Sequence, residues 1–165
     1  MLEDIDVQEA IRRAIQTEKN AMNFYDIGAL QMKDPAAIKV FKLLASEEKV
    51  HAGQFFKVYK GADIPSFDEF MAAPPAHESS WIAVLAKTIK TDFNEQKAME
   101  LALEKELKLE QTLRETAARI SNPEVREIFE LNARETHNHY LLIESEYARL
   151  MGMVHESDMD IFVRE

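Results

Sequence analysis

Apolar residues recur every three or four positions along four long segments of the 165-residue chain. This spacing puts them on one face of an α-helix, so each segment is predicted to form an amphipathic helix. The predicted helices cover about residues 7–32, 35–59, 94–120 and 123–151. The second and fourth start at Asp34-Pro35 and Asn122-Pro123, where a capping side chain precedes a proline suited to the first helical turn.

A long connection, residues 61–93, separates the second predicted helix from the third. It contains Pro65, Pro74 and Pro75, followed by the run SSWIAVLAKTIK, which predicts a short helix starting at Ser79 or Ser80. A four-helix bundle with one long crossover accounts for such a connection. The sequence therefore predicts an all-α domain over residues 1–151, built from two helical hairpins, with a C-terminal tail at residues 152–165.

The two predicted hairpins resemble each other in sequence. A shift of 88 positions lays residues 14–55 over 102–143 without a gap, and the turn KDPAAIKVF then falls on SNPEVREIF. Identical pairs include Glu18 with Glu106 and His51 with His139. We therefore expect two hairpins related by a pseudo-two-fold axis.

Polar residues interrupt the apolar stripes at matching places. Glu48 and His51 lie within the core-facing stripe of the second helix, and Glu18 occupies an apolar position of the first. The repeat adds Glu106 on the third helix and His139 on the fourth. An unpartnered buried carboxylate is costly, whereas carboxylates and Glu-x-x-His histidines on facing helices can bind two iron or manganese ions. These five residues are the candidate metal ligands.

Composition limits the chemistry that the chain can support. There is no cysteine, which excludes disulfides, thiolate zinc sites and iron–sulfur clusters and leaves carboxylates and imidazoles as ligands. The formal net charge of −10 argues against nucleic acid or an anionic membrane as a partner. The sequence shows neither a signal peptide nor a run of about 20 apolar residues, so we expect a cytoplasmic protein.

The chain resembles the rubrerythrin branch of the ferritin-like superfamily over about residues 7–150. The resemblance is carried by AIQTEKNAMNFY, LLASEEKVHAGQF, AMELALEKE and NPEVREIFELNARETHNHYLL, one in each long helix. It implies a ferritin-like bundle in which Glu18 and Glu106 are single-carboxylate ligands, Glu48 is a bridging carboxylate, and His51 and His139 are imidazole ligands.

The sequence departs from this family pattern in two ways. Thr136 stands where the resemblance implies a second bridging glutamate, and Glu135 or Glu110 could replace that ligand, or one metal position is weakened or lost. We include Glu135 among the candidate ligands. Rubrerythrins usually also carry a four-cysteine rubredoxin-like module, and this sequence has no cysteine. Electrons would then come from a separate donor protein.

The resemblance implies a non-haem di-iron oxidoreductase that reduces hydrogen peroxide, with dioxygen as the other candidate substrate. One alternative is a metal-binding bundle without turnover, for iron sequestration or sensing, which the change at Thr136 favours. The other is a scaffold bundle whose site has decayed and whose melting temperature does not change with metal. Two iron ions are expected for the enzyme and one for the binding protein, and manganese or zinc would accept the same ligands. Bundles of this kind commonly pair, so a homodimer is expected.

Overall fold

The computed structural model describes the 165-residue chain except His77, Asp92 and Glu165, and except the side chains of Asp4, Ile5 and residues 153–164. Its described part is all-helical, which confirms the predicted fold class. The helices in chain order are α1 (Asp4–Gln31), α2 (Pro35–Phe56), α3 (Phe67–Ala72), α4 (Ser80–Thr91), α5 (Glu95–Ala118) and α6 (Pro123–Arg164). None of these helices has an apolar stretch long enough to cross a bilayer, within the residues described.

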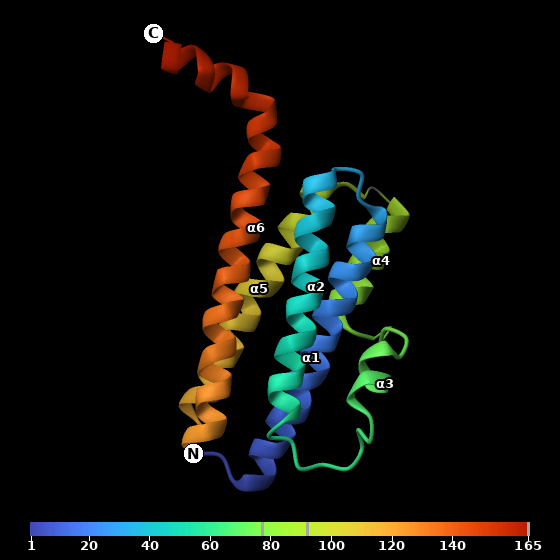
Figure 1. Cartoon of the computed structure of the whole chain (residues 1–165), viewed down its shortest axis with the longest axis vertical. Coiled ribbons are helices and arrows are strands. Elements are labelled where there is room, and N and C mark those ends of the chain that lie inside the picture. Colours follow the sequence, from blue (N-terminus) through green and yellow to red (C-terminus); the bar gives the residue numbers. More distant parts are fainter. Residues whose placement is uncertain (77, 92, 165) are drawn as a thin grey trace.

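The four long helices form two hairpins. α1 packs along α2 and α5 packs along α6, while α2 and α6 meet where the hairpins face each other (Figure 1). The crossover contains α3, which lies against α2, and α4, which contacts both α1 and α5. This arrangement is a ferritin-like four-helix bundle with one long crossover.

Side-chain caps start the helices where the sequence predicts them. The Asp34 carboxylate accepts a hydrogen bond from the Ala37 amide at 2.9 Å, and the Asn122 side chain accepts one from the Val125 amide at 3.2 Å. Asn94 caps α5 in the same way, through the Lys97 amide at 2.8 Å. Each of these caps satisfies a backbone N–H that has no partner within the helix.

Some helix ends differ from the prediction, and one short helix was not predicted. α2 ends at Phe56 rather than near Tyr59, and α6 continues through Gly152 to Arg164, so the predicted helix end near Met151 is wrong. A single glycine lowers helix stability by only about 1 kcal/mol and stops a helix mainly when it adopts a positive φ, which no described glycine does. The short helix α3 was not predicted, because six residues show no helical period.

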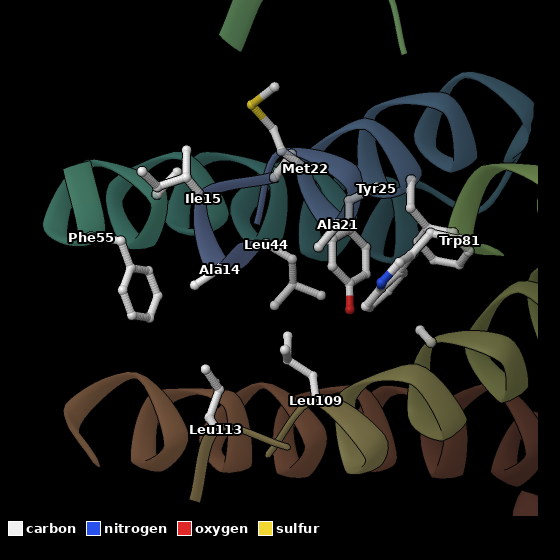
Figure 2. Packing of buried hydrophobic residues seen from close by; sticks show 14 of the residues in the cluster. Ala14, Ile15, Ala21, Met22, Tyr25, Leu44, Phe55, Trp81, Leu109 and Leu113 are labelled. Atoms are coloured by element: carbon white, nitrogen blue, oxygen red, sulfur yellow. The ribbon is translucent and has the colours of Figure 1, made fainter. Parts of the chain in front are cut away.

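The core lies between the two hairpins. Figure 2 shows Leu44 and Phe55 pointing from α2 toward Leu109 and Leu113 on α5. These four side chains are all buried. The apolar stripes that predicted the helices therefore face each other across the bundle, and any polar residue on the same stripes is enclosed with them.

Lys19 fixes the crossover to the first hairpin. Its ammonium group donates hydrogen bonds to the Ala73 carbonyl at 2.8 Å and to the Asn23 side chain at 2.9 Å. Burial lowers the pKa of Lys19, but both contacts are to oxygen acceptors that favour the charged form. The end of α3 is thus held against α1, one residue along from Glu18.

Asp34 is expected to contribute measurably to stability, because it caps α2 and pairs with Arg149 of α6 at 2.5 Å. Asp34→Ala should lower the free energy of unfolding by about 0.5–2 kcal/mol, the usual range for loss of an N-cap. Asp34→Asn retains a capping oxygen and should lose less. Urea unfolding followed by circular dichroism measures both variants, and equal stability of all three proteins would contradict the prediction.

The pH dependence of the same variants has a defined sign. The Ala37 amide and Arg149 hold the pKa of Asp34 below its usual value. Its contribution is therefore present above the unfolded pKa, near 3.9, and is lost as pH falls through the folded pKa. Asp34→Asn should lack this acid-dependent part of the loss.

Candidate metal centre

The first hairpin encloses three polar side chains. Glu18 on α1 and Glu48 and His51 on α2 are all buried, with exposed fractions of 0%, 1% and 1%. The Nδ1 atom of His51 lies 3.5 Å from Glu48 Oε2 and 3.8 Å from Glu18 Oε2. Glu48 and His51 are one turn apart and share a helix face. Two carboxylates thus surround one nitrogen of the His51 ring.

The second hairpin supplies two more buried groups, Glu106 on α5 and His139 on α6. His139 Nδ1 lies 3.7 Å from Glu106 Oε1 and 2.8 Å from Glu48 Oε1 of the other hairpin. Glu48 therefore turns one oxygen toward each histidine. Ligand atoms of Glu48, His51 and His139 all lie within 4.8 Å of one another. The structure brings together the five residues that the repeat singled out.

The outer nitrogen of each ring contacts a partly exposed glutamate of the opposite hairpin. His51 Nε2 lies 2.5 Å from Glu135 Oε2, and His139 Nε2 lies 2.6 Å from Glu47 Oε2. The two imidazoles stack with their centroids 5.1 Å apart. Such outer contacts fix the orientation and tautomer of a metal-binding histidine. Both Nδ1 atoms therefore face the buried carboxylates.

The structure gives Glu135 a contact different from the one considered for it. Its carboxylate meets the outer nitrogen of His51, on the opposite side of the ring from Glu18 and Glu48. Its repeat partner Glu47 does the same for His139, a role that the sequence reasoning missed. The available signal was that both residues lie four positions before a histidine. Glu110, the other candidate substitute, contacts His137 and Arg114 instead.

Thr136 lies inside the bundle at the position equivalent to Glu48. Its exposed fraction is 0%, and its hydroxyl has no hydrogen-bond partner among the described residues. One turn earlier on α6, Asn132 is equally buried and its Oδ1 atom is likewise unpaired within the described part of the chain. The predicted departure from the two-fold pattern is therefore buried in the bundle, one helical turn from His139.

The protonation of the site follows from its burial and its charges. Burial and the nearby charge of Glu48 raise the pKa of Glu18 well above its usual value, and burial also raises the pKa of Glu106. Burial opposes ionisation of Glu48 and His51 too, but contacts with Glu18 and the two histidines lower the pKa of Glu48, and contacts with Glu18 and Glu48 raise that of His51 to about 11. The metal-free rings therefore hold protons that a metal ion must displace.

Tyr25 connects the aromatic core to the site. Its hydroxyl donates a hydrogen bond to Glu106 Oε1 at 2.5 Å, and Figure 2 shows this oxygen pointing toward the second hairpin. The ring packs edge-on against Phe24 and Phe41. A tyrosine in this position orients one carboxylate oxygen of Glu106 and leaves the other, Oε2, without a partner among the described residues.

The buried groups fit a metal ion. Five carboxylate and imidazole atoms lack a hydrogen-bond partner within the described residues: both Oε atoms of Glu18, Oε2 of Glu48, Oε2 of Glu106 and Nδ1 of His51. Buried polar atoms are normally paired, so a group of unpaired carboxylate oxygens and an imidazole nitrogen inside the bundle suits a bound cation that displaces the ring proton. Carboxylate oxygens with imidazole nitrogens are ligands that iron, manganese and zinc accept.

A comparison with models of protein families shows the family of this chain. The family model described as rubrerythrin matches residues 9–147, which include all five buried candidate ligands. The chain belongs to the rubrerythrin family. No match was found among curated proteins or among solved structures. Membership in the rubrerythrin family and the buried cluster of glutamates and histidines together point to metal binding inside the bundle.

The outer glutamates provide a test of how the histidines are held. Glu135→Gln and Glu47→Gln should each weaken metal affinity by roughly 10- to 100-fold, the usual effect of removing an outer partner of a histidine ligand. Isothermal titration with Mn²⁺ measures this affinity without turnover. Glu144→Gln, an exposed glutamate on α6, is the matched control and should bind as the wild type does. Unchanged affinity in both outer variants would contradict the assignment.

Proposed function

We propose that this chain is a non-haem di-iron oxidoreductase that reduces hydrogen peroxide with electrons from an external donor protein. The observation that carries the proposal is the convergence of Glu18, Glu48, His51, Glu106 and His139 inside the bundle. Three carboxylates and two imidazoles from four helices are a donor set for two ions. Membership in the rubrerythrin family supports the same function.

Each residue has a distinct part in this proposal. Glu48 faces both histidines and would be shared by the two ions, while Glu18 would hold an ion with His51 and Glu106 would hold one with His139. Glu47 and Glu135 hold the outer ring nitrogens, so that each Nδ1 is available to a metal ion. Iron held by these residues would supply the redox chemistry, in which one hydrogen peroxide takes up two electrons and two protons and yields two molecules of water.

The experiment that tests the function is a single-turnover reaction. Protein loaded anaerobically with two ferrous ions is mixed with one equivalent of hydrogen peroxide, and ferric absorption is followed by stopped flow. The proposal expects both ions to be oxidised by one peroxide, faster than free ferrous iron under the same conditions. Oxidation at the rate of free iron would overturn the enzymatic function. Glu135→Gln, which changes the partner of the outer nitrogen of His51, should slow the reaction without changing its stoichiometry.

Metal binding without turnover is the second candidate function. The observation that favours it is Thr136, which removes one carboxylate from the two-fold arrangement. A site with one strong and one weak position would sequester or sense iron rather than carry out two-electron chemistry. Metal content after loading and gel filtration separates the two functions: two ions per chain support the oxidoreductase and one supports sequestration.

The proposal also includes a homodimer and a cytoplasmic location for the chain. Light scattering of the purified protein at several concentrations tests the dimer. A donor protein is identified by the rate at which it reduces the ferric form in the absence of peroxide.

A further inference from the structure

The two hairpins match at every candidate ligand position but one. Glu18 corresponds to Glu106 and His51 to His139, whereas Glu48 corresponds to Thr136. Thr136 is fully buried and lies one turn before His139, so its hydroxyl is on the same helix face as that imidazole. The buried site therefore has three carboxylates where two-fold symmetry would supply four.

Charge balance makes this difference consequential. Three ionised carboxylates contribute a charge of −3 with neutral imidazoles, and two divalent ions contribute +4, which leaves +1 inside the bundle. An uncompensated buried charge is strongly unfavourable. The buried ligands alone are thus one negative charge short, because Glu47 and Glu135 lie further out, on the outer ring nitrogens at the partly exposed edge of the site. A monoanion beside Thr136 would supply the missing charge inside the bundle.

The polar groups beside Thr136 are suited to hold such a ligand. The Asn132 amide nitrogen donates to Gln54 Oε1 at 3.0 Å and to the Ile128 carbonyl at 2.8 Å, so both of its hydrogens are used and its Oδ1 is an acceptor. That oxygen and the Thr136 hydroxyl are unpaired among the described residues. A buried hydroxyl and a buried amide oxygen, one turn apart, are typical partners of a buried water molecule or small ion.

This polarity is confined to one side of the site. In the repeat, Asn132 corresponds to Leu44, and Gln54 corresponds to Leu142. Asn132 and the half-buried Gln54 therefore place a polar pair between α2 and α6, one turn from Thr136, where the other half has two leucines. The departure from symmetry is not the loss of one ligand alone, because neighbouring polar groups accompany it.

We propose that Thr136 creates an exchangeable position for a small monoanion in the metal site, in the place of a fourth carboxylate. The Thr136 hydroxyl donates a hydrogen bond to the anion, and Asn132 Oδ1 accepts the hydrogen of an anion that carries one, such as hydroxide or hydroperoxide. This inference rests on the proposed two-metal function. It places the substrate beside Thr136, where the second hairpin lacks a counterpart of Glu48.

Azide binding to the ferric protein tests the position directly, because azide is a small monoanion with a visible charge-transfer band on iron. The wild-type protein should form a saturable azide complex. Thr136→Val, which keeps the shape and removes the donor, should weaken azide binding by roughly 10- to 100-fold, the effect of losing a hydrogen bond to a charged group. Thr136→Ser should keep wild-type affinity. Thr136→Glu supplies the missing carboxylate and should form no azide complex.

Controls separate failure of this inference from failure of the proposed function. Thr88→Val changes a threonine of α4 whose hydroxyl bonds the Val84 carbonyl, and it should bind azide as the wild type does. Iron content is measured for every variant. Two ions in the wild type without azide binding, or equal azide affinity in Thr136→Val, would overturn the anion position alone. One ion in the wild type would overturn the two-metal function and the anion position together.

Metal-linked stability gives a second measurement that does not depend on azide. In the metal-free protein, Thr136→Glu adds a fourth buried carboxylate and should lower the melting temperature, whereas Thr136→Val removes an unpaired hydroxyl and should not. Mn²⁺ should then raise the melting temperature of Thr136→Glu by more than that of the wild type, because the fourth carboxylate completes the charge balance. A smaller rise in Thr136→Glu would overturn the charge argument.

Discussion

Glu48→Gln is expected to abolish binding of the second metal ion. It should also lower the affinity for the first ion by more than any substitution outside the buried site does. Glu48 directs one oxygen to each histidine, at 2.8 Å from His139 and 3.5 Å from His51. Its counterpart in the other hairpin is Thr136, so no second carboxylate occupies the equivalent place. The loss of affinity should exceed the roughly 10- to 100-fold typical of outer partners.

Glutamine variants of three glutamates at increasing depth should show increasing loss of metal binding. Glu144→Gln lies on the surface and should have no effect, Glu47→Gln removes an outer contact of His139, and Glu48→Gln removes the bridging ligand. Metal content by mass spectrometry and Mn²⁺ affinity by calorimetry should fall in that order. Circular dichroism confirms that each variant is folded. A folded Glu48→Gln protein that retains two ions at wild-type affinity would show that Glu48 is not a bridging ligand.

The helices and the five central residues follow from the sequence because the helical period and the internal repeat can both be recognised without knowing how the hairpins pack. A carboxylate on an apolar stripe has to face the core, so Glu18 and Glu106 are identified without knowledge of how the hairpins pack. The repeat then relates His139 to His51 across 88 positions. Neither signal depends on contacts between the hairpins, and the structure brings the residues close together.

The contacts between hairpins do not follow from the same signals. Whether Glu135 meets the inner or the outer nitrogen of His51 depends on the offset between α2 and α6, which no helical period encodes. The same holds for Glu47, whose place beside a stripe predicts only a solvated charge. Tyr25 is evident as a core residue, but its bond to Glu106 depends on the distance between α1 and α5. The sequence therefore predicts which polar residues are buried in the site, but not which of their atoms meet across the bundle.

Glu18→Gln is expected to leave the metal-free protein nearly as stable as the wild type and to remove most of its stabilisation by metal. Burial and the charge of Glu48 raise the pKa of Glu18, so the metal-free side chain favours the neutral form that glutamine imitates. Its change in the free energy of unfolding should be less than about 1 kcal/mol. In the wild type, free metal at about 1,000 times its Kd adds about 4 kcal/mol, or roughly 8–16 °C in melting temperature for a chain of this size.

Melting curves with and without Mn²⁺, at several pH values, test both the stability of the metal-free protein and its stabilisation by metal. A carboxyl whose folded pKa exceeds its unfolded value stabilises the folded state at low pH, and this contribution is lost as pH rises through the folded pKa. The metal-free wild type should therefore lose more stability than Glu18→Gln as pH rises from about 4.3, the unfolded pKa of glutamate. His51 and His139 also titrate, with pKa values raised to about 11, so the difference between the two proteins is the informative quantity. Because glutamine cannot neutralise a cation, Mn²⁺ should raise the melting temperature of Glu18→Gln by much less than that of the wild type, and an equal rise would remove Glu18 from the ligand set.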